Sequence, residues 1–161
     1  MAKSLDAAGG LVALWWYRLK DKPGGRTLFS MLIGRMAPYT NTIGARVDEL
    51  GPGHSRWVMR DRRKVRNHLN SIHAVALVNL AEVASGTAML MGLTPDVRGI
   101  VTGLSIQYRK KARGTLTATC DCSVPAVTSE LSLDVPAVIT DQAGDIVAEA
   151  RVTWRLAKRE K

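Results

Sequence analysis

The sequence predicts an α+β protein in which one antiparallel β-sheet curls around a single long helix. Three observations lead to this fold class. The segment from about residue 71 to about residue 91 is apolar around nearly its whole circumference, as a helix of about 30 Å that is covered on most sides would be. Residues 100–156 contain segments in which apolar and polar side chains alternate with a period of two, which is typical of strands. Turn sequences separate these segments, and hairpin turns join antiparallel neighbours.

The chain is expected to begin with two short helices, at residues 9–20 and 27–36, joined by the turn sequence DKPGG. The second helix should end before Pro38, because the residue that precedes a proline is disfavoured in helical conformation. These helices form an N-terminal helical segment over residues 1–40, for which we expect the role of a brace or a lid. The segment contains no residue pattern that indicates chemistry.

The sheet is expected within residues 42–156 of a single domain that spans residues 1–161. Its predicted strands cover residues 43–49, 55–60, 100–108, 115–122, 131–139 and 146–156. The long helix should begin near Ser71, a suitable N-cap residue. Alternation places Ile100 on the same face of its strand as Leu104, and Pro136 predicts an edge strand or a β-bulge.

The charge balance narrows the classes of partner. The chain of 161 residues has 23 lysines and arginines against 14 acidic residues, a formal net charge of +9, which favours an anionic partner. Nucleic acid, an acidic lipid surface and a phosphorylated small molecule all meet that condition. No helix-turn-helix, zinc-ligand or RNA-binding aromatic pattern is present, so we expect no nucleic-acid partner. The hydrophobic fraction of 46% argues against disorder.

The apolar segments and the cysteines predict the compartment. The first ten residues lack the apolar core of a signal peptide, and LVALWW is too short to span a bilayer. The apolar run from Ile72 to Leu93 is interrupted by polar residues, so we expect a core helix and no membrane insertion. Cys120 and Cys122 are poorly placed for a disulfide and supply too few ligands for a metal site. We therefore expect reduced thiols in a cytoplasmic protein.

One carboxylate, Glu82, interrupts the apolar helix. On a helix it falls on the same stripe as Asn79 and Gly86, because residues three and four apart are neighbours. A carboxylate in apolar surroundings is unfavourable unless it is paired, solvated or protonated, and desolvation would raise its pKa toward the range of a general base. Glu82 is therefore a candidate catalytic residue. The structural alternative is that it caps a loop or pairs with an arginine across a dimer interface.

Two motifs carry a resemblance to a known family. The first is NHLNSIHAVALVNLAEVASG, in which Asn67, His73 and Glu82 stand at spacings of six and nine residues. The second is the strand-turn-strand sequence LSIQYRKKARGTLTATC. With both motifs the chain, over about residues 42–156, resembles the hotdog-fold acyl-CoA thioesterases, in particular the phenylacetyl-CoA and 4-hydroxybenzoyl-CoA thioesterase branch. The resemblance implies a hotdog fold, in which an antiparallel sheet wraps one long central helix.

The resemblance also implies an enzyme, an acyl-CoA thioesterase that hydrolyses an acyl thioester. Glu82 would act as general base or nucleophile, and the backbone N–H of Ala74, at the start of the helix, would stabilise the oxyanion. His73 would hold the loop or help to polarise the carbonyl, and Asn67 would position water or the thioester. A structural histidine and an ordinary turn asparagine are the alternatives. The family usually has two glycines after the histidine, whereas Ala74 and Val75 stand here and would narrow the site.

Partners follow from the same resemblance. Coenzyme A carries phosphates, for which arginine is a suitable ligand. Arg109 and Arg113 lie on the matched turn, and Arg63 lies in the basic run RDRRKVR. The substrate would be a thioester of coenzyme A or of an acyl carrier protein, with no further cofactor and no metal. Proteins of this kind resemble homodimers or dimers of dimers, whose sites lie between two helices, so a second subunit would complete the pocket.

Two other functions stay open at the level of the sequence. On the same fold, a hydratase or dehydratase would use the histidine and the acid together on a C–O bond. A non-catalytic protein would bind an acyl chain or an acyl carrier without turnover, an alternative that the departure at Ala74 and Val75 keeps open. Release of a thiol from acyl-CoA distinguishes hydrolysis from binding, and a change in enoyl absorbance distinguishes it from hydration.

Overall fold

The computed structural model describes residues 8–159 and has the predicted α+β architecture. Its helices are α1 (Ala8–Leu19), α2 (Gly25–Met36), α3 (Pro38–Asn41) and α4 (Ala74–Gly92), with the short 3-10 helix η2 (Arg63–Val65). Its strands are β1 (Arg46–Gly51), β2 (His54–Met59), β3 (Val97–Tyr108), β4 (Leu116–Asp121), β5 (Leu131–Thr140) and β6 (Ile146–Lys158). The N-terminal residues 1–7, on which the expectation of no signal peptide partly rests, lie outside the described residues.

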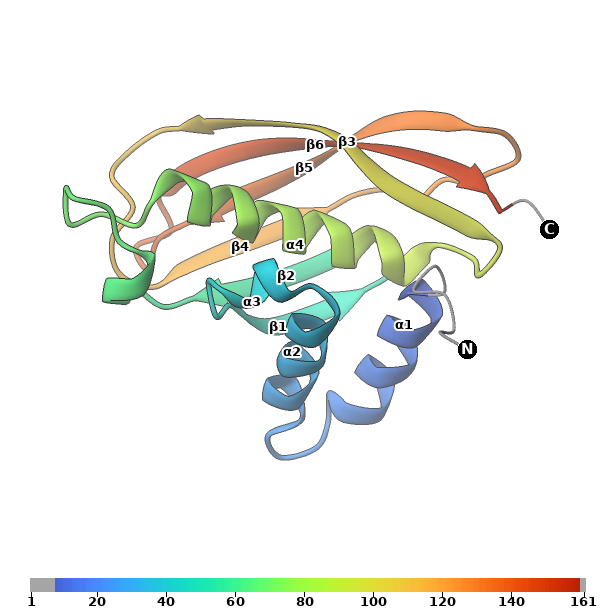
Figure 1. Ribbon diagram of the computed structural model, residues 1–161, viewed down its shortest axis with the longest axis horizontal. Helices are drawn as coiled ribbons and strands as arrows, with labels where there is room; N and C mark the ends of the chain where they lie inside the picture. Colours follow the sequence, from blue (N-terminus) through green and yellow to red (C-terminus); the bar gives the residue numbers. More distant parts are fainter. Residues whose placement is uncertain (1–7, 160–161) are drawn as a thin grey trace.

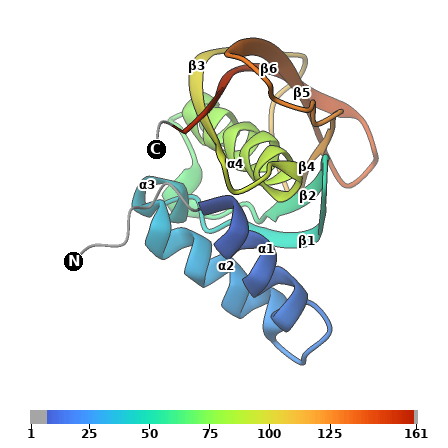
Figure 2. The ribbon, with the colours of Figure 1, turned by 90° about the vertical axis from the view of Figure 1, so that its right-hand side faces the viewer.

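One six-stranded antiparallel sheet, in the order β1-β2-β4-β5-β6-β3, curls around α4 (Figure 1). In the view turned by 90°, α1 and α2 lie on the other side of α4 from β5 and β6 (Figure 2). The hotdog arrangement predicted from the sequence is therefore confirmed. By length and composition α4 could also cross a membrane, but 67% of that apolar window is buried inside the protein, as expected for a core helix.

The start of α4 differs from the prediction. The N-cap is His73, whose Nδ1 accepts a hydrogen bond from the N–H of Val75 at 3.1 Å. Ser71 does not cap the helix, because its hydroxyl donates to the carbonyl of Ala112 at 2.9 Å. The prediction of Ser71 as N-cap was wrong, since a contact with a distant part of the chain uses the side chain that the local sequence offered as a cap.

A β-bulge changes which side chains of β3 face the core. Val101 and Gly103 pair with consecutive residues of β6, so Thr102 has no pairing partner there. Val101 and Leu104 both pack against the core, whereas Ile100 is 57% exposed. The prediction that Ile100 and Leu104 share a face was wrong, because one inserted residue moves the side chains on either side of it to opposite faces.

Proline is accommodated in β5 where the sheet has a local gap. β5 lies between β4 and β6 in the strand order, so Pro136 is not on a strand at the edge of the whole sheet. Its pairing with β4 covers only residues 138–140, however, and Pro136 lies outside that stretch. On the other side Pro136 is paired with Arg151 of β6. The missing N–H is tolerated because, among the described residues, this part of β5 has one strand neighbour instead of two.

The N-terminal helices form a fixed layer against α4 and β1. The aromatic rings of Trp16 in α1 and Phe29 in α2 meet edge to face, with centroids 5.2 Å apart, and both side chains are buried. Ser30 of α2 accepts a hydrogen bond from the N–H of Val47 in β1 at 3.0 Å. These contacts hold the two helices against each other and against β1, and the role of a brace or a lid stays a prediction.

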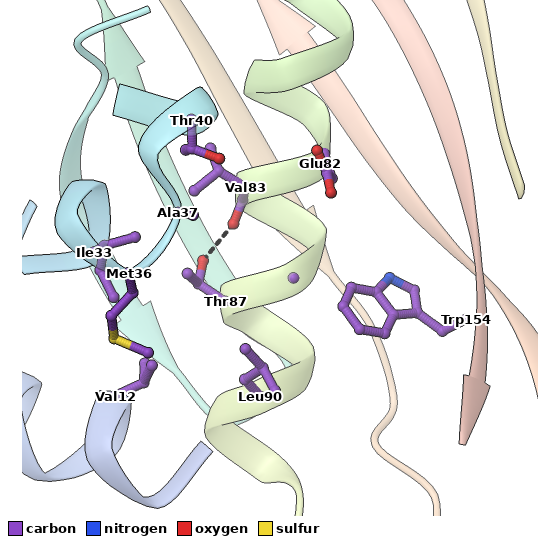
Figure 3. A pocket seen from close by; sticks show the side chains of 11 residues that line it. Val12, Ile33, Met36, Ala37, Thr40, Glu82, Val83, Thr87, Leu90 and Trp154 are labelled. Atoms are coloured by element: carbon purple, nitrogen blue, oxygen red, sulfur yellow. Dashed lines mark hydrogen bonds between the residues drawn. The ribbon is translucent and has the colours of Figure 1, made fainter. Parts of the chain in front are cut away.

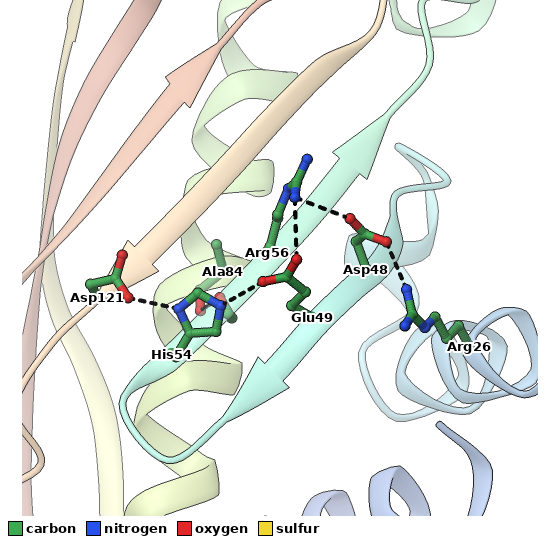
Figure 4. A network of polar contacts seen from close by, with 8 residues as sticks. Arg26, Asp48, Glu49, His54, Arg56, Ala84 and Asp121 are labelled. Atoms are coloured by element: carbon green, nitrogen blue, oxygen red, sulfur yellow. Dashed lines mark hydrogen bonds and ion pairs between the residues drawn. The ribbon is translucent and has the colours of Figure 1, made fainter. Parts of the chain in front are cut away.

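Charged side chains join α2 to three strands on the outside of the sheet (Figure 4). Arg26 of α2 donates to Asp48 of β1 at 2.8 Å. The two ring nitrogens of His54 in β2 contact Glu49 of β1 at 3.2 Å and Asp121 of β4 at 2.7 Å. The hydrogen bond with Asp121, followed by the one with Glu49, raises the pKa of His54 against the opposing effect of its partial burial.

We expect this network to stabilise the protein more at acidic than at alkaline pH. Because the folded-state pKa of His54 is raised above its ordinary value of 6.5, its contribution is complete below that value and is lost as pH rises through the higher folded-state pKa. The loss of unfolding free energy in His54→Gln should therefore be larger at about pH 5.5 than at about pH 9. Chemical denaturation at both pH values checks this, with the exposed His68→Gln as control. A difference that grows with pH would contradict the assignment.

Candidate functional site

Loops that are far apart in the sequence meet at the start of α4. The segment 109–114, which joins β3 to β4, is tied to the residues before α4, because the carbonyl of Ala112 accepts the N–H of Ile72 at 2.8 Å. Asp61, which follows β2, accepts the N–H of Gly114 at 3.0 Å. These contacts fix the two predicted motifs and the basic run of residues 60–66 around one helix terminus.

The amide of Ala74 is available at this terminus. Ala74 is the first residue of α4, and its N–H has no hydrogen-bond partner among the described residues. The first amides of a helix lack partners within the helix and lie at the positive end of its dipole, which suits a developing negative charge. Tyr108 donates its hydroxyl to the Ala74 carbonyl at 3.3 Å, and burial raises the pKa of Tyr108. His73, by contrast, is engaged in capping the helix, as in the structural alternative.

Asn67 organises the loop that leads into α4. Its side-chain oxygen accepts the N–H of Leu69 at 2.9 Å and of Ser71 at 3.2 Å, and its own N–H donates to the Ser71 carbonyl at 2.8 Å. The side-chain oxygen of Asn67 therefore binds amides within the loop, as expected for an ordinary turn asparagine. Any contact of Asn67 with a ligand would have to come from its NH₂ group.

The three predicted phosphate ligands are placed differently. Arg63 is the first residue of η2. The carbonyl of Val65, the last residue of η2, accepts the N–H of His73, the N-cap of α4, at 2.8 Å. Arg63 is therefore near the start of α4. Arg113 lies beside Ala112 on the loop that contacts the same region. Both arginine side chains are exposed. Arg109 instead forms an ion pair with Glu149 of β6 at 2.6 Å, so its charge is already balanced.

Glu82 lies two helical turns beyond Ala74, about 12 Å along the axis of α4. Its side chain is exposed. In the single chain the carboxylate is therefore solvated, which is one of the conditions under which it is tolerated on an apolar helix. The helix is buried over most of its surface, and its neighbours on the same stripe, Asn79 and Gly86, are buried, whereas Glu82 itself is exposed. Ala74 and Glu82 of one chain are too far apart to act on the same atom.

An apolar pocket of about 280 Å³ opens beside Glu82 (Figure 3). One wall is α4, on which Val83, Gly86 and Leu90 follow Glu82 at helical spacing. Met36, near the end of α2, lies on the opposite wall. The remaining lining residues come from α1, α2, the segment around α3, α4 and β6: Val12, Ile33, Ala37, Thr40, Thr87 and Trp154.

A second cavity, of about 360 Å³, lies nearer the start of α4 and is more polar. Its lining includes His73, the N-cap of α4, Asn79 of α4, Lys64 and Arg66. Asn79 donates to the Tyr39 carbonyl at 3.1 Å, but its own side-chain oxygen is buried without a partner in the described part of the chain. An unpartnered buried acceptor of this kind is available to an N–H donor.

The N-terminal helices were not predicted to be part of the site, although the apolar pattern of the central helix indicates that another element must cover it. A helix that is apolar nearly all round needs cover on every side, and a sheet curled around it leaves one side open. Helices α1 and α2 provide this cover, and their residues Val12, Ile33 and Met36 line the pocket. The segment for which no chemistry was predicted therefore supplies a wall of the pocket.

Comparisons with known proteins support the fold. A family model described as a domain of unknown function, DUF4442, matches residues 25–156. The crystal structure of a structural-genomics target has a TM-score of 0.80 and 30% identity, covering 92% of this chain and 99% of that chain. A Pseudomonas aeruginosa protein of unknown function, described as a probable thioesterase, has a TM-score of 0.74 and 22% identity, covering 83% of this chain and 96% of that chain. A Haemophilus influenzae thioesterase has a TM-score of 0.65 and 13% identity, covering 74% of this chain and 82% of that chain. No curated protein matches the chain.

Proposed function

This chain belongs to the DUF4442 family, a domain of unknown function, and we propose that it is a thioesterase that hydrolyses an acyl thioester. The observation that carries the proposal is the place of one carboxylate. Glu82 is exposed on the central helix and lines an apolar pocket that suits an acyl chain. Proteins of similar fold that are described as thioesterases support the same reaction class.

In the proposed reaction Glu82 is the general base. Its carboxylate takes a proton from water, whose oxygen attacks the carbonyl carbon of the thioester. The negative charge that develops on the carbonyl oxygen is stabilised by the N–H of Ala74. The C–S bond breaks, and protonated Glu82 returns its proton to the leaving thiolate, which gives a carboxylic acid and a thiol. Direct attack by the Glu82 carboxylate, followed by hydrolysis of the mixed anhydride, gives the same products.

This mechanism requires a second copy of the chain, because Ala74 and Glu82 of one chain are about 12 Å apart. We propose a homodimer, or a dimer of such dimers, in which the start of one α4 lies beside the middle of the other. Strand β3 supports this assembly, since it has 12 residues and stands at the end of the sheet order. A long edge strand offers unpaired backbone groups to another chain. Ile100, which is 57% exposed, adds apolar surface on this strand.

We propose that the thiol part of the substrate is coenzyme A or the arm of an acyl carrier protein. Arg63 and Arg113 extend into solvent near the start of α4, and the net charge of +9 favours an anionic substrate. Phosphates on the thiol part would be bound by these two guanidinium groups. Cys120 and Cys122 are both free, which is compatible with a reducing cytoplasm.

The test is thiol release from acyl-CoAs of graded chain length. We expect turnover by the wild-type protein and a KM at least about tenfold higher in the double variant Arg63→Gln/Arg113→Gln, because a hydrogen bond to a charged group contributes about 1.5–3 kcal/mol. The double variant Arg18→Gln/Arg35→Gln, with exposed arginines on the N-terminal helices, is the matched control. With acyl-pantetheine, which lacks the nucleotide phosphates, the two double variants should behave alike.

Three results would count against these assignments. Equal KM values for the two double variants would exclude phosphate binding at Arg63 and Arg113. Binding of acyl-CoA without thiol release would contradict hydrolysis and favour the non-catalytic acyl-binding function. A change in enoyl absorbance without thiol release would favour hydration.

A further inference from the structure

We infer that the apolar pocket between the N-terminal helices and α4 holds the tail of a medium-length aliphatic acyl group, and that Met36 and Gly86 limit the length of that tail. The inference rests on the proposed thioesterase function and adds the class of substrate.

The surface along α4 changes from polar to apolar. Asn79, Glu82, Gly86 and Leu90 form one stripe, because residues three and four apart on a helix are neighbours. At the Asn79 end lies the polar cavity, with lysine, arginine and histidine in its lining. At the Leu90 end lies the apolar pocket. A substrate with a polar arm and an apolar tail therefore fits in one direction only, with its tail toward Leu90.

The length of the pocket sets the length of the tail. From Glu82 to Leu90 the helix advances by two turns, about 12 Å. An extended chain advances by somewhat less than one C–C bond of about 1.5 Å per carbon, so this distance corresponds to about nine or ten carbons. The pocket volume of about 280 Å³ lies just below the roughly 300–1,000 Å³ of common small-molecule sites. A single chain therefore fits it better than a ring system.

Trp154 provides an independent observation. Its side chain lines the pocket and is only 6% exposed, and its Nε1–H has no hydrogen-bond partner in the described part of the chain. A buried donor without a partner is unfavourable, and an acceptor on a ligand would satisfy it. Figure 3 shows Trp154 on the same side of α4 as Glu82. An oxygen of the acyl thioester that reaches this side of α4 would supply the acceptor.

Gly86 and Met36 leave the space that the tail requires. A Cβ atom added at Gly86 would lie 3.4 Å from Cζ2 of Trp154, which also lines the pocket, so a longer side chain would take up space between these two residues. Met36 borders the pocket from α2, and its unbranched thioether side chain adapts to an irregular cavity. Replacing either residue by a larger apolar one should shorten the longest acyl group that binds.

Isothermal titration with S-alkyl-CoA thioethers, which cannot be hydrolysed, tests this inference. For the wild type we expect affinity to rise about fourfold per methylene group, as burial of about 0.8 kcal/mol predicts, until the tail has about ten carbons. Met36→Trp should weaken binding of the decyl thioether about a hundredfold, equivalent to three or four methylene groups. Met31→Trp is the matched control, because Met31 lies on the same helix but is 61% exposed and outside the pocket lining. Gly86→Leu provides a second variant, and circular dichroism verifies that each protein is folded.

The results distinguish this inference from the proposed function. An affinity that does not depend on chain length, or identical length profiles for wild type, Met36→Trp and Gly86→Leu, would overturn the tail assignment even if thiol release is observed. The expected length profile without any thiol release would support the pocket and exclude the proposed catalysis.

Discussion

Replacing Glu82 by glutamine is expected to lower kcat for thioester hydrolysis by about 10³-fold, within the range of about 10²–10⁴ that a positioned general base contributes. Glutamine keeps the size of the side chain but cannot take a proton from water. Because the side chain of Glu82 is exposed, the melting temperature should stay close to that of the wild type. Steady-state thiol release and a thermal melt of the same preparation measure both quantities.

A carboxylate elsewhere on the surface controls for the loss of one negative charge. Glu130 is exposed just before β5, and Glu130→Gln should leave kcat unchanged. Wild-type kcat in Glu82→Gln would remove Glu82 from the chemistry. If that variant also formed monomers, the result would favour an ion pair of Glu82 across the subunit interface, which is the structural role that the sequence left open.

Replacing Phe29 by alanine is expected to lower the free energy of unfolding by about 3–5 kcal/mol, as truncation of a buried phenylalanine usually does. Phe29 is 0% exposed and its ring meets that of Trp16 edge to face. The truncation would leave a cavity between α1 and α2. Urea denaturation, followed by far-UV circular dichroism, measures the loss.

Met31→Ala controls for the change of side chain on the same helix. Met31 is 61% exposed, so its truncation should change the free energy of unfolding by no more than about 0.5 kcal/mol. Similar small losses in the two variants would show that α1 and α2 do not pack as a fixed layer. The apolar pocket would then lack the rigid wall to which Met36 belongs.

Much of the fold follows from local patterns. The long helix was predictable because residues 74–92 are apolar on nearly every side, and the strands of the C-terminal half were predictable from their alternation. Local patterns failed where distant segments intervene. Ser71 is a good N-cap residue, but its hydroxyl is used by Ala112, and the bulge beside Ile100 is set by pairing with β6.

Candidate residues divide in the same way. The spacing of Asn67, Ala74 and Glu82 can be read from the sequence, and it identified all three as candidate site residues. Their environments are not local properties. The oxygen of Asn67 is bound by loop amides, and the charge of Arg109 is paired with Glu149 from a strand far along the chain.

The central helix, the alternating strands and the position of one carboxylate on that helix can be predicted from the sequence, because they depend on the spacing of residues within one segment. The exposure of Glu82 and the apolar pocket that α1 and α2 form beside it became apparent in the folded chain. Which side of a helix is covered depends on contacts between segments far apart in the chain, and neither helical nor strand periodicity encodes those contacts.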